Sequence, residues 1–302
     1  MSLLEVTGLV KKFGVHPAVD GLHFEITPGR CLALLGPNGA GKTTTLRMLS
    51  GLLEPTSGTI RFAGGSEKDI RGLIGYLPQY PAFFNWMTGR EFLSFTAKLA
   101  GLSGKEATTL TEEVLERVGL KDAARRRIGG YSGGMKQRLG LAQAVIHRPK
   151  LLILDEPVSA LDPQGRREVL ELLREMKSET TILFSTHVLH DVEEISEEVI
   201  IMDKGRIIVQ GDLQRLLYDH EQPLIRVKAR NLSIEWVRGL RKEPFVRELN
   251  ETTDGFTVLV TEVSQARSSL LRSIADLGIE VESFEIGATS LEDLFLKAVS
   301  AE

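Results

Sequence analysis

The sequence predicts an α/β protein with a mostly parallel central sheet, followed by a small α+β domain. Three observations support this fold class. Unbroken apolar runs of strand length alternate with helical patterns over residues 1–220, which is typical of strands buried on both faces of a parallel sheet. Within that region, about residues 88–148 show helical periodicity and no strand-like run. After residue 220, shorter strand-like and helix-like segments alternate again.

The apolar runs predict the strands of the parallel sheet. The first run is followed at once by a glycine-rich turn, and the second by two acidic residues. The helical stretch covers about residues 88–148, where apolar residues recur at helical spacing, and it predicts a helical insertion standing on the sheet. The four runs are 31–35, 151–154, 180–185 and 199–202.

A change in charge indicates a domain boundary. Residues 221–302 carry 10 basic and 14 acidic residues, whereas residues 1–220 carry 27 of each. The polar segment 219–223 lies at this change and ends in a proline, as a linker often does. We therefore expect two domains, 1–220 and 221–302.

The second domain is expected to have split βαβ character. It shows no catalytic group of residues, so a dimerisation or regulatory role is favoured over chemistry. The pattern predicts strands over 224–227, 256–260 and 279–286, helices over 233–240 and 266–277, and a last helix capped by Ser290.

Composition argues against several classes of protein. The chain has 37 basic and 41 acidic residues, so bulk charge does not favour nucleic acid. No apolar run approaches the roughly 20 residues of a membrane-spanning helix, and no secretory signal is visible. The chain has a single cysteine, Cys31, so a disulfide within the chain is excluded. We therefore expect a soluble cytoplasmic protein.

The glycine-rich segment after the first run matches the phosphate-binding pattern G-x-x-x-x-G-K-[ST] at every fixed position. Its glycines let backbone N–H groups point at phosphate oxygens, and the following helix adds its positive end. Lys42 can reach the β- and γ-phosphates of a nucleoside triphosphate, and the Thr43 hydroxyl can ligate Mg²⁺. The segment is Gly36, Pro37, Asn38, Gly39, Ala40, Gly41, Lys42 and Thr43, and Thr44 continues into the helix.

Two carboxylates follow the second run, at the carboxyl end of a predicted parallel strand, where open sheets bind ligands. Asp155 would hold Mg²⁺, directly or through water. Glu156 would lie near the γ-phosphate and could orient and deprotonate the attacking water. Beside a phosphate loop, these roles are favoured over a solvated strand end.

A serine and two glycines at a predicted helix start form a second anion site. With this segment, the order of motifs over about residues 1–220 resembles the nucleotide-binding subunit of ATP-binding cassette (ABC) transporters. The resemblance implies a P-loop NTPase fold (ABC cassette) in which an antiparallel β portion and a helical subdomain join the mostly parallel core. The motifs are the phosphate loop, Gln79, Ser132-Gly133-Gly134, Asp155-Glu156, Asp162 and His187.

The resemblance implies that two copies meet head to tail. ATP with Mg²⁺ would lie between the phosphate loop of one copy and the Ser-Gly-Gly segment of the other. Catalysis is assigned to Glu156, His187 and Gln79, and Mg²⁺ binding to Thr43, Gln79 and Asp155. Nucleotide binding is assigned to Phe13, which would stack on adenine, and to Gly36, Pro37, Asn38, Gly39, Ala40, Gly41, Lys42, Thr43, Thr44, Ser132, Gly133, Gly134 and Asp162.

Two positions depart from the usual family segment Leu-Ser-Gly-Gly-Gln. This chain has Tyr131 and Met135 at the outer positions. The Ser-Gly-Gly that contacts phosphate is intact, so phosphate binding is expected to survive without the contacts of the usual glutamine.

The resemblance also implies transport through separate transmembrane permease subunits. The aromatic-rich segment 80–87 matches the region that receives a short helix of the membrane subunit. The second domain and the ending 290–296 resemble bacterial exporters of drugs, lipids, polysaccharides or peptides. We therefore expect an ATPase that drives export, lies in the cytoplasm on the inner face of the membrane, and has no nucleic-acid partner.

The sequence leaves two alternatives open. A soluble ATPase of the same motor class could act on translation or nucleic acid, with the basic run 125–127 as its support. A nucleotide switch could bind ATP and dimerise without turnover. The intact Asp155, Glu156 and His187 argue against the switch.

Overall fold

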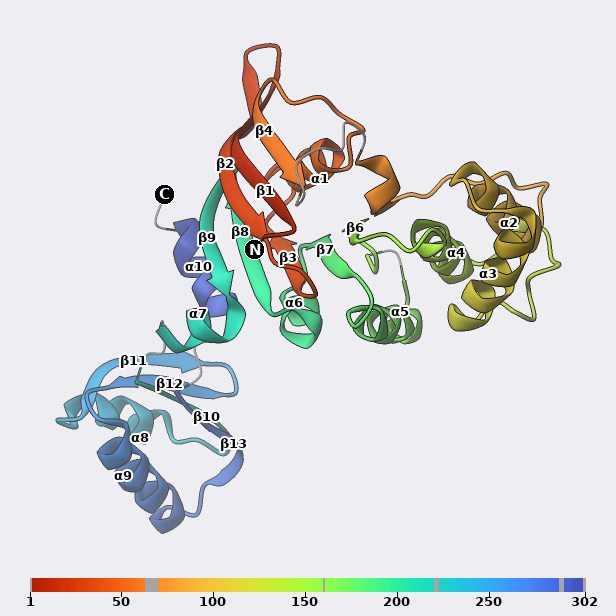
Figure 1. Cartoon of the computed structure of the whole chain (residues 1–302). Coiled ribbons are helices and arrows are strands. Elements are labelled where there is room, and N and C mark those ends of the chain that lie inside the picture. The colour runs from red at the N-terminus through yellow and green to blue at the C-terminus, as the bar shows by residue number, and fades with distance from the viewer. Residues whose placement is uncertain (1, 63–69, 160, 220–222, 288–290, 301–302) are drawn as a thin grey trace. The chain divides into compact units, whose positions relative to one another are not determined.

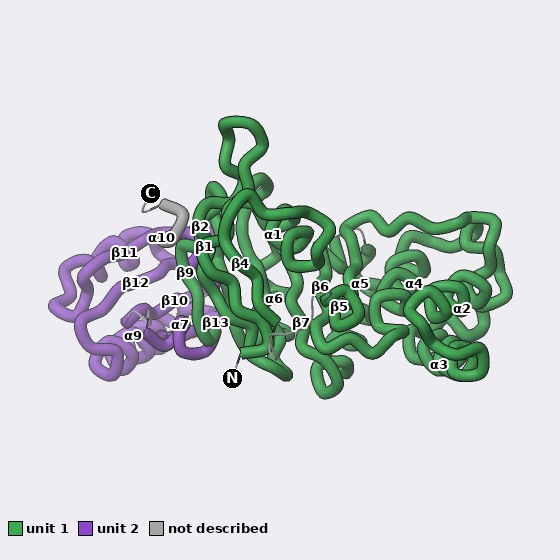
Figure 2. The backbone as a smooth tube through the Cα atoms, turned by 45° about the horizontal axis from the view of Figure 1, so that its top comes forward, with its two compact units in different colours: residues 1–213 green, residues 214–302 purple. Residues whose placement is uncertain are grey.

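The computed structural model describes residues 2–62, 70–159, 161–219, 223–287 and 291–300. The chain forms two compact units, Met1–Leu213 and Gln214–Glu302 (Figure 2). This division falls before the predicted linker, because most of the short helix α7 (Leu213–Asp219) groups with the second unit. Among the described residues, no helix combines the length and the apolar character that crossing a bilayer requires.

A six-stranded sheet in the order β5-β6-β7-β3-β8-β9 forms the centre of the first unit (Figure 1). Neighbouring strands run parallel except β9, which is antiparallel to β8. Strands β3 and β6 are buried along their whole length, as expected for strands covered on both faces. The predicted, mostly parallel core is confirmed. The strands are β3 (Cys31–Leu35), β5 (Ile74–Leu77), β6 (Leu151–Asp155), β7 (Thr181–Thr186), β8 (Glu198–Asp203) and β9 (Arg206–Asp212).

A three-stranded antiparallel sheet in the order β2-β1-β4 is the second layer of this unit. Leu4 and Leu9 of β1 share one hydrophobic core with Leu46 and Leu49 of helix α1. This packing ties the sheet to the helix that follows the phosphate loop. The elements are β1 (Leu4–Phe13), β2 (His16–Ile26), β4 (Ser57–Phe62) and α1 (Lys42–Leu49). The first unit also contains α5 (Pro163–Met176) and α6 (Leu189–Ile195).

Three helices between β5 and β6 form the predicted helical subdomain (Figure 1). Helix α2 begins with a capping box, in which Thr88 and Glu91 each accept a hydrogen bond from the other's backbone N–H. Phe92, Leu115 and Leu139, one from each helix, lie in a shared core. The helices are α2 (Gly89–Leu99), α3 (Gly104–Arg117) and α4 (Gly133–Val145).

Tyr131 lies inside this helical core and needs a glycine opposite it. Its hydroxyl donates a hydrogen bond to the Ala123 carbonyl at 2.8 Å, and burial raises the pKa of the phenol. A Cβ at Gly89 would lie 2.2 Å from the hydroxyl oxygen. We expect Gly89→Ala to lower the free energy of unfolding by about 1–3 kcal/mol, the usual cost of overpacking, as measured by urea denaturation.

Gly104 provides the matched control for this substitution. It is also the first residue of its helix, and a Cβ there would meet nothing within 4 Å. Gly104→Ala should therefore leave stability nearly unchanged. The cost of Gly89→Ala should also shrink in a Tyr131→Phe background, which lacks the clashing oxygen. Equal costs at both glycines would refute this packing argument.

The second unit follows the order β-α-β-β-α-β, the split βαβ arrangement. Its sheet has the order β11-β12-β10-β13 with every pair antiparallel. Strand β11 was not predicted, because Leu249 is its one fully buried residue and polar residues fill most other positions. The predicted cap Ser290 lies outside the described residues. The elements are β10 (Leu224–Arg230), α8 (Ile234–Gly239), β11 (Val246–Thr252), β12 (Gly255–Val260), α9 (Val263–Asp276), β13 (Glu280–Ile286) and α10 (Leu291–Ser300).

Candidate nucleotide site

The carboxyl ends of four parallel strands meet at one edge of the main sheet. Leu35, the last residue of β3, is opposite Thr186 of β7, and Ser185 is opposite Asp155 at the end of β6. The phosphate loop, the acidic pair and the histidine turn therefore follow neighbouring strands at the same edge. Gln79 comes two residues after β5, which pairs with β6, and is half-buried.

The phosphate loop is packed so tightly that side chains would not fit at two of its glycines. A Cβ at Gly36 would lie 2.4 Å from the Met202 carbonyl oxygen. A Cβ at Gly41 would lie 2.5 Å from the Ala18 carbonyl oxygen, and Gly41 has a φ of +100°, which favours glycine. Helix α1 begins at the next residue, so the N–H groups of its first turn lie at the end of the loop, where a helix can bind an anion.

Lys42 folds back over the loop. Its Nζ donates hydrogen bonds to the carbonyl oxygens of Gly36 at 2.7 Å and Pro37 at 3.1 Å. Burial lowers the pKa of this ammonium group, and the nearby carboxylates of Glu156 and Asp155 partly oppose that shift. A buried ammonium held mainly by neutral carbonyls is suited to an anionic ligand, because phosphate oxygens would stabilise its charge.

The acidic pair is held from two sides. Thr43 Oγ1 donates to Asp155 Oδ1 at 3.1 Å, and Ser185 Oγ donates to the same oxygen at 2.7 Å. The backbone N–H of Glu156 donates to Ser185 Oγ at 3.0 Å. A buried carboxylate beside a hydroxyl matches the few oxygen ligands that Mg²⁺ takes from a protein when phosphates supply others.

Glu156 lies between the buried carboxylate of Asp155 and solvent. Its side chain is 10% exposed, and its Oε1 is 3.0 Å from Nδ1 of His187, which is about half exposed. The imidazole thus orients a carboxylate that can accept a proton from water at the rim of the loop. Glu156 also has a φ of +49°, an uncommon conformation for a residue other than glycine.

Ser185 is the member of this group that was not predicted from the sequence. Serine at the end of an apolar strand has no distinctive pattern, and its role depends on the strand beside it. The available signal was its position two residues before His187, at the end of an apolar run. Its one hydroxyl touches both Asp155 and the backbone of Glu156.

The Ser-Gly-Gly segment lies elsewhere on the first unit. Ser132 caps α4 and Asp162 caps α5, each accepting a backbone N–H. Together with Gly133 and Gly134 they line a cavity of about 360 Å³, and no residue of 36–44 lines it. Figure 1 shows α4 apart from α1. The structure therefore brings the Ser-Gly-Gly segment together with Asp162 and not with the phosphate loop.

The two unusual residues beside this segment turn inward. Tyr131 is 6% exposed, and Met135 packs against the same helical core. Both departures from the family segment are therefore accommodated by packing within the subdomain. Phe13, at the end of β1, is 55% exposed, and its ring lies 5.5 Å from Lys11 Nζ. Its accessible face is open to stacking.

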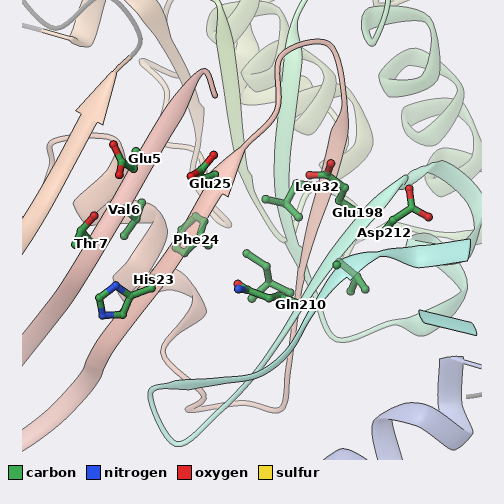
Figure 3. Close-up of a pocket in the computed structure, with 13 residues that line it drawn as sticks. Glu5, Val6, Thr7, His23, Phe24, Glu25, Leu32, Glu198, Gln210 and Asp212 are labelled. Atoms are coloured by element: carbon green, nitrogen blue, oxygen red, sulfur yellow. The ribbon is translucent and has the colours of Figure 1, made fainter. Parts of the chain in front are cut away.

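A separate cavity lies away from this site and is lined by residues of β1, β2, β3, β8 and β9 (Figure 3). It measures about 710 Å³, and Glu5, Glu25, Glu198 and Asp212 are among its lining residues. Arg30 forms ion pairs at 3.2 Å with both Glu198 and Asp212. Because this cavity lacks phosphate-loop residues, it is not the nucleotide site.

Two family models match the chain in succession. One, described as ABC transporter, matches residues 19–159. The other, described as ATP-binding protein DrrA1-3-like, C-terminal domain, matches residues 211–299. The two matches together extend over both compact units.

Known proteins are similar along the whole chain. The chain is 49% identical over 299 residues to the uncharacterized ABC transporter ATP-binding protein YxlF of Bacillus subtilis (strain 168), with 99% of this chain and 100% of the relative covered. It is 35% identical over 303 residues to the daunorubicin/doxorubicin resistance ATP-binding protein DrrA of Streptomyces peucetius, with 97% and 91% covered. A solved structure of an ATP binding subunit of an ABC transporter matches with a TM-score of 0.65 and 31% identity, over 71% of this chain and 92% of that one.

Proposed function

This chain belongs to the family of ATP-binding subunits of ABC transporters, and we propose that it powers export of a drug-like small molecule through separate membrane subunits. Subunits of this family hydrolyse ATP to drive transport. The observation that carries the export proposal is the similarity to a drug-resistance subunit over 97% of the chain, together with the DrrA-like model over the second unit. The alternative of a non-transport ATPase is not favoured, because the first matching model is that of ABC transporters.

Glu156 is the proposed general base for hydrolysis. Its carboxylate is fixed by His187 and would accept the proton of the attacking water. Lys42, released from its own loop carbonyls, would bind the β- and γ-phosphates. Asp155, Thr43 and Gln79 would hold Mg²⁺, which when bound neutralises charge on the transferred phosphoryl group.

The proposed working unit is a head-to-tail homodimer. Support comes from the separation of Ser132, Gly133 and Gly134 from the phosphate loop of the same chain. Each copy would offer this segment and Asp162 to the nucleotide held by the other copy. A symmetric pair of this kind contains two composite sites.

An exposed aromatic patch supports docking to a membrane subunit. The patch consists of Phe84, Trp86 and Phe95, which are 49%, 70% and 42% exposed. Phe84 contacts both other rings, at centroid distances of 5.9 and 6.5 Å. Clustered aromatic side chains on a surface are typical anchors for a protein partner. We propose that a permease segment covers this patch and holds the motor on the inner face of the membrane.

Trp86→Ala tests the docking surface. A central aromatic anchor typically contributes about 2 kcal/mol or more to an interface, so recovery of the membrane partner with the tagged protein should fall severalfold or more. The ATPase rate of the detached subunit should stay close to that of the unmodified protein. Tyr218→Ala is the control, because Tyr218 is 74% exposed and lies on α7, outside the patch. Undiminished recovery with Trp86→Ala would exclude the patch.

The export proposal is tested by reconstitution. The motor and the membrane polypeptide that purifies with it are placed in proteoliposomes, and ATP-dependent movement of fluorescent doxorubicin is followed. We expect transport that is lost with Glu156→Gln. Recovery with ribosomes or nucleic acid, and never with a membrane protein, would contradict the proposal.

A further inference from the structure

We propose that Gln137 is a positioning residue that fixes Glu156 from helix α4, the helix whose first residues serve the partner copy's nucleotide. The inference rests on the proposed head-to-tail dimer and adds a physical link between its two sites. Gln137 is 7% exposed, and its Nε2 donates a hydrogen bond of 2.8 Å to the carbonyl oxygen of Pro157. Pro157 directly follows the proposed general base.

The hydrogen bond from Gln137 to Pro157 helps to hold the backbone turn at Glu156 in its conformation. A non-glycine residue with a φ of +49° is held there by its surroundings, because the left-handed conformation is disfavoured for L-residues. The backbone N–H of Glu156 donates a hydrogen bond to Ser185 Oγ of β7. The carbonyl after the turn is bonded to Gln137 of α4. Ser159 bonds the Glu156 carbonyl within the turn itself, and β7 and α4 are the two elements that hold the turn from outside.

Helix α4 connects this hydrogen bond to the Ser-Gly-Gly segment, which this chain would offer to the partner's nucleotide. Gln137 lies five residues after Ser132, the N-cap of the helix, so the two positions are about 7 Å apart along the axis. A helix is stiff over that distance. When the first residues of α4 bind the partner's nucleotide and shift, the helix therefore moves Gln137 with them. The hydrogen bond from Gln137 passes this shift to the Pro157 carbonyl. Glu156 of one site is thereby aligned by engagement at the other site.

Gln137→Met tests the proposal, because methionine keeps the length of the side chain and removes the donor. We expect kcat to fall by about 10–100-fold, the range that follows from a small misplacement of a catalytic group, with KM for ATP changed by less than about twofold. Gln143→Met is the matched control. It is a half-buried glutamine on the same helix, six residues further on, and its replacement should leave kcat unchanged.

A double-mutant cycle separates positioning from general damage. If Gln137 acts through Glu156, Gln137→Met should cause little further loss in a Glu156→Gln background. ATP-induced dimerisation of the double variant, followed by size-exclusion chromatography, should match that of Glu156→Gln alone. Additive losses, weakened dimerisation or an unchanged kcat in the single variant would each overturn the inference. Failure of the proposed function would be distinct, since Glu156→Gln itself would then be fully active.

Discussion

Replacing Glu156 with glutamine should leave ATP binding intact and reduce the rate of ATP hydrolysis by roughly 10²–10⁴, the usual contribution of a general base. Glutamine keeps the size of the side chain but cannot accept the proton of the attacking water. The hydrogen bonds that hold Asp155 come from Thr43 and Ser185, so the proposed metal position is unaffected. Phosphate release at saturating ATP measures the loss, and nucleotide titration checks the affinity.

The same substitution should accumulate an ATP-loaded dimer, because closure no longer leads to hydrolysis. Glu171→Gln is the control, since Glu171 is an exposed carboxylate on α5. It should show the turnover and the monomer–dimer distribution of the unmodified protein. Unchanged turnover in Glu156→Gln would remove Glu156 from the catalytic role.

Lys42→Ala should weaken ATP binding itself by about 10–100-fold, which corresponds to the roughly 1.5–3 kcal/mol of a hydrogen bond to a charged group. The buried ammonium donates hydrogen bonds to two loop carbonyls, and burial lowers its pKa, so its charge would gain stabilisation from phosphate contact. Calorimetric titration measures the affinity. Lys98→Ala, at an exposed position on α2, should bind ATP like the unmodified protein.

Mixing variants extends this prediction to the composite site. Lys42→Ala damages the phosphate loop of one copy, and Ser132→Arg blocks the segment offered to its partner. Each variant alone should be inactive, since both of its sites are damaged. A mixed dimer concentrates both lesions in one site and leaves the other intact, so random mixing should restore up to about a quarter of the activity. A mixture as inactive as its components would argue against sites built from two copies.

Local sequence patterns predicted the core of the fold and most of the candidate site. The phosphate loop is a contiguous pattern, and its glycines are required by contacts that leave no space for a Cβ. The buried strands appeared as apolar runs because both of their faces are covered. Strand β11 escaped prediction because it lies at the edge of its sheet and buries little.

The sequence by itself determined which chemical groups this protein carries and which strands and helices bear them, since hydrophobic periodicity and loop composition act over short stretches of chain. Tertiary structure alone decided how those groups meet. The Ser185 hydroxyl bonds Asp155 across 30 positions, and Gln137 bonds Pro157 across 20. Such contacts depend on strand register and helix packing, which no local pattern encodes. For the same reason, only the folded chain revealed that the Ser-Gly-Gly segment lies away from its own phosphate loop.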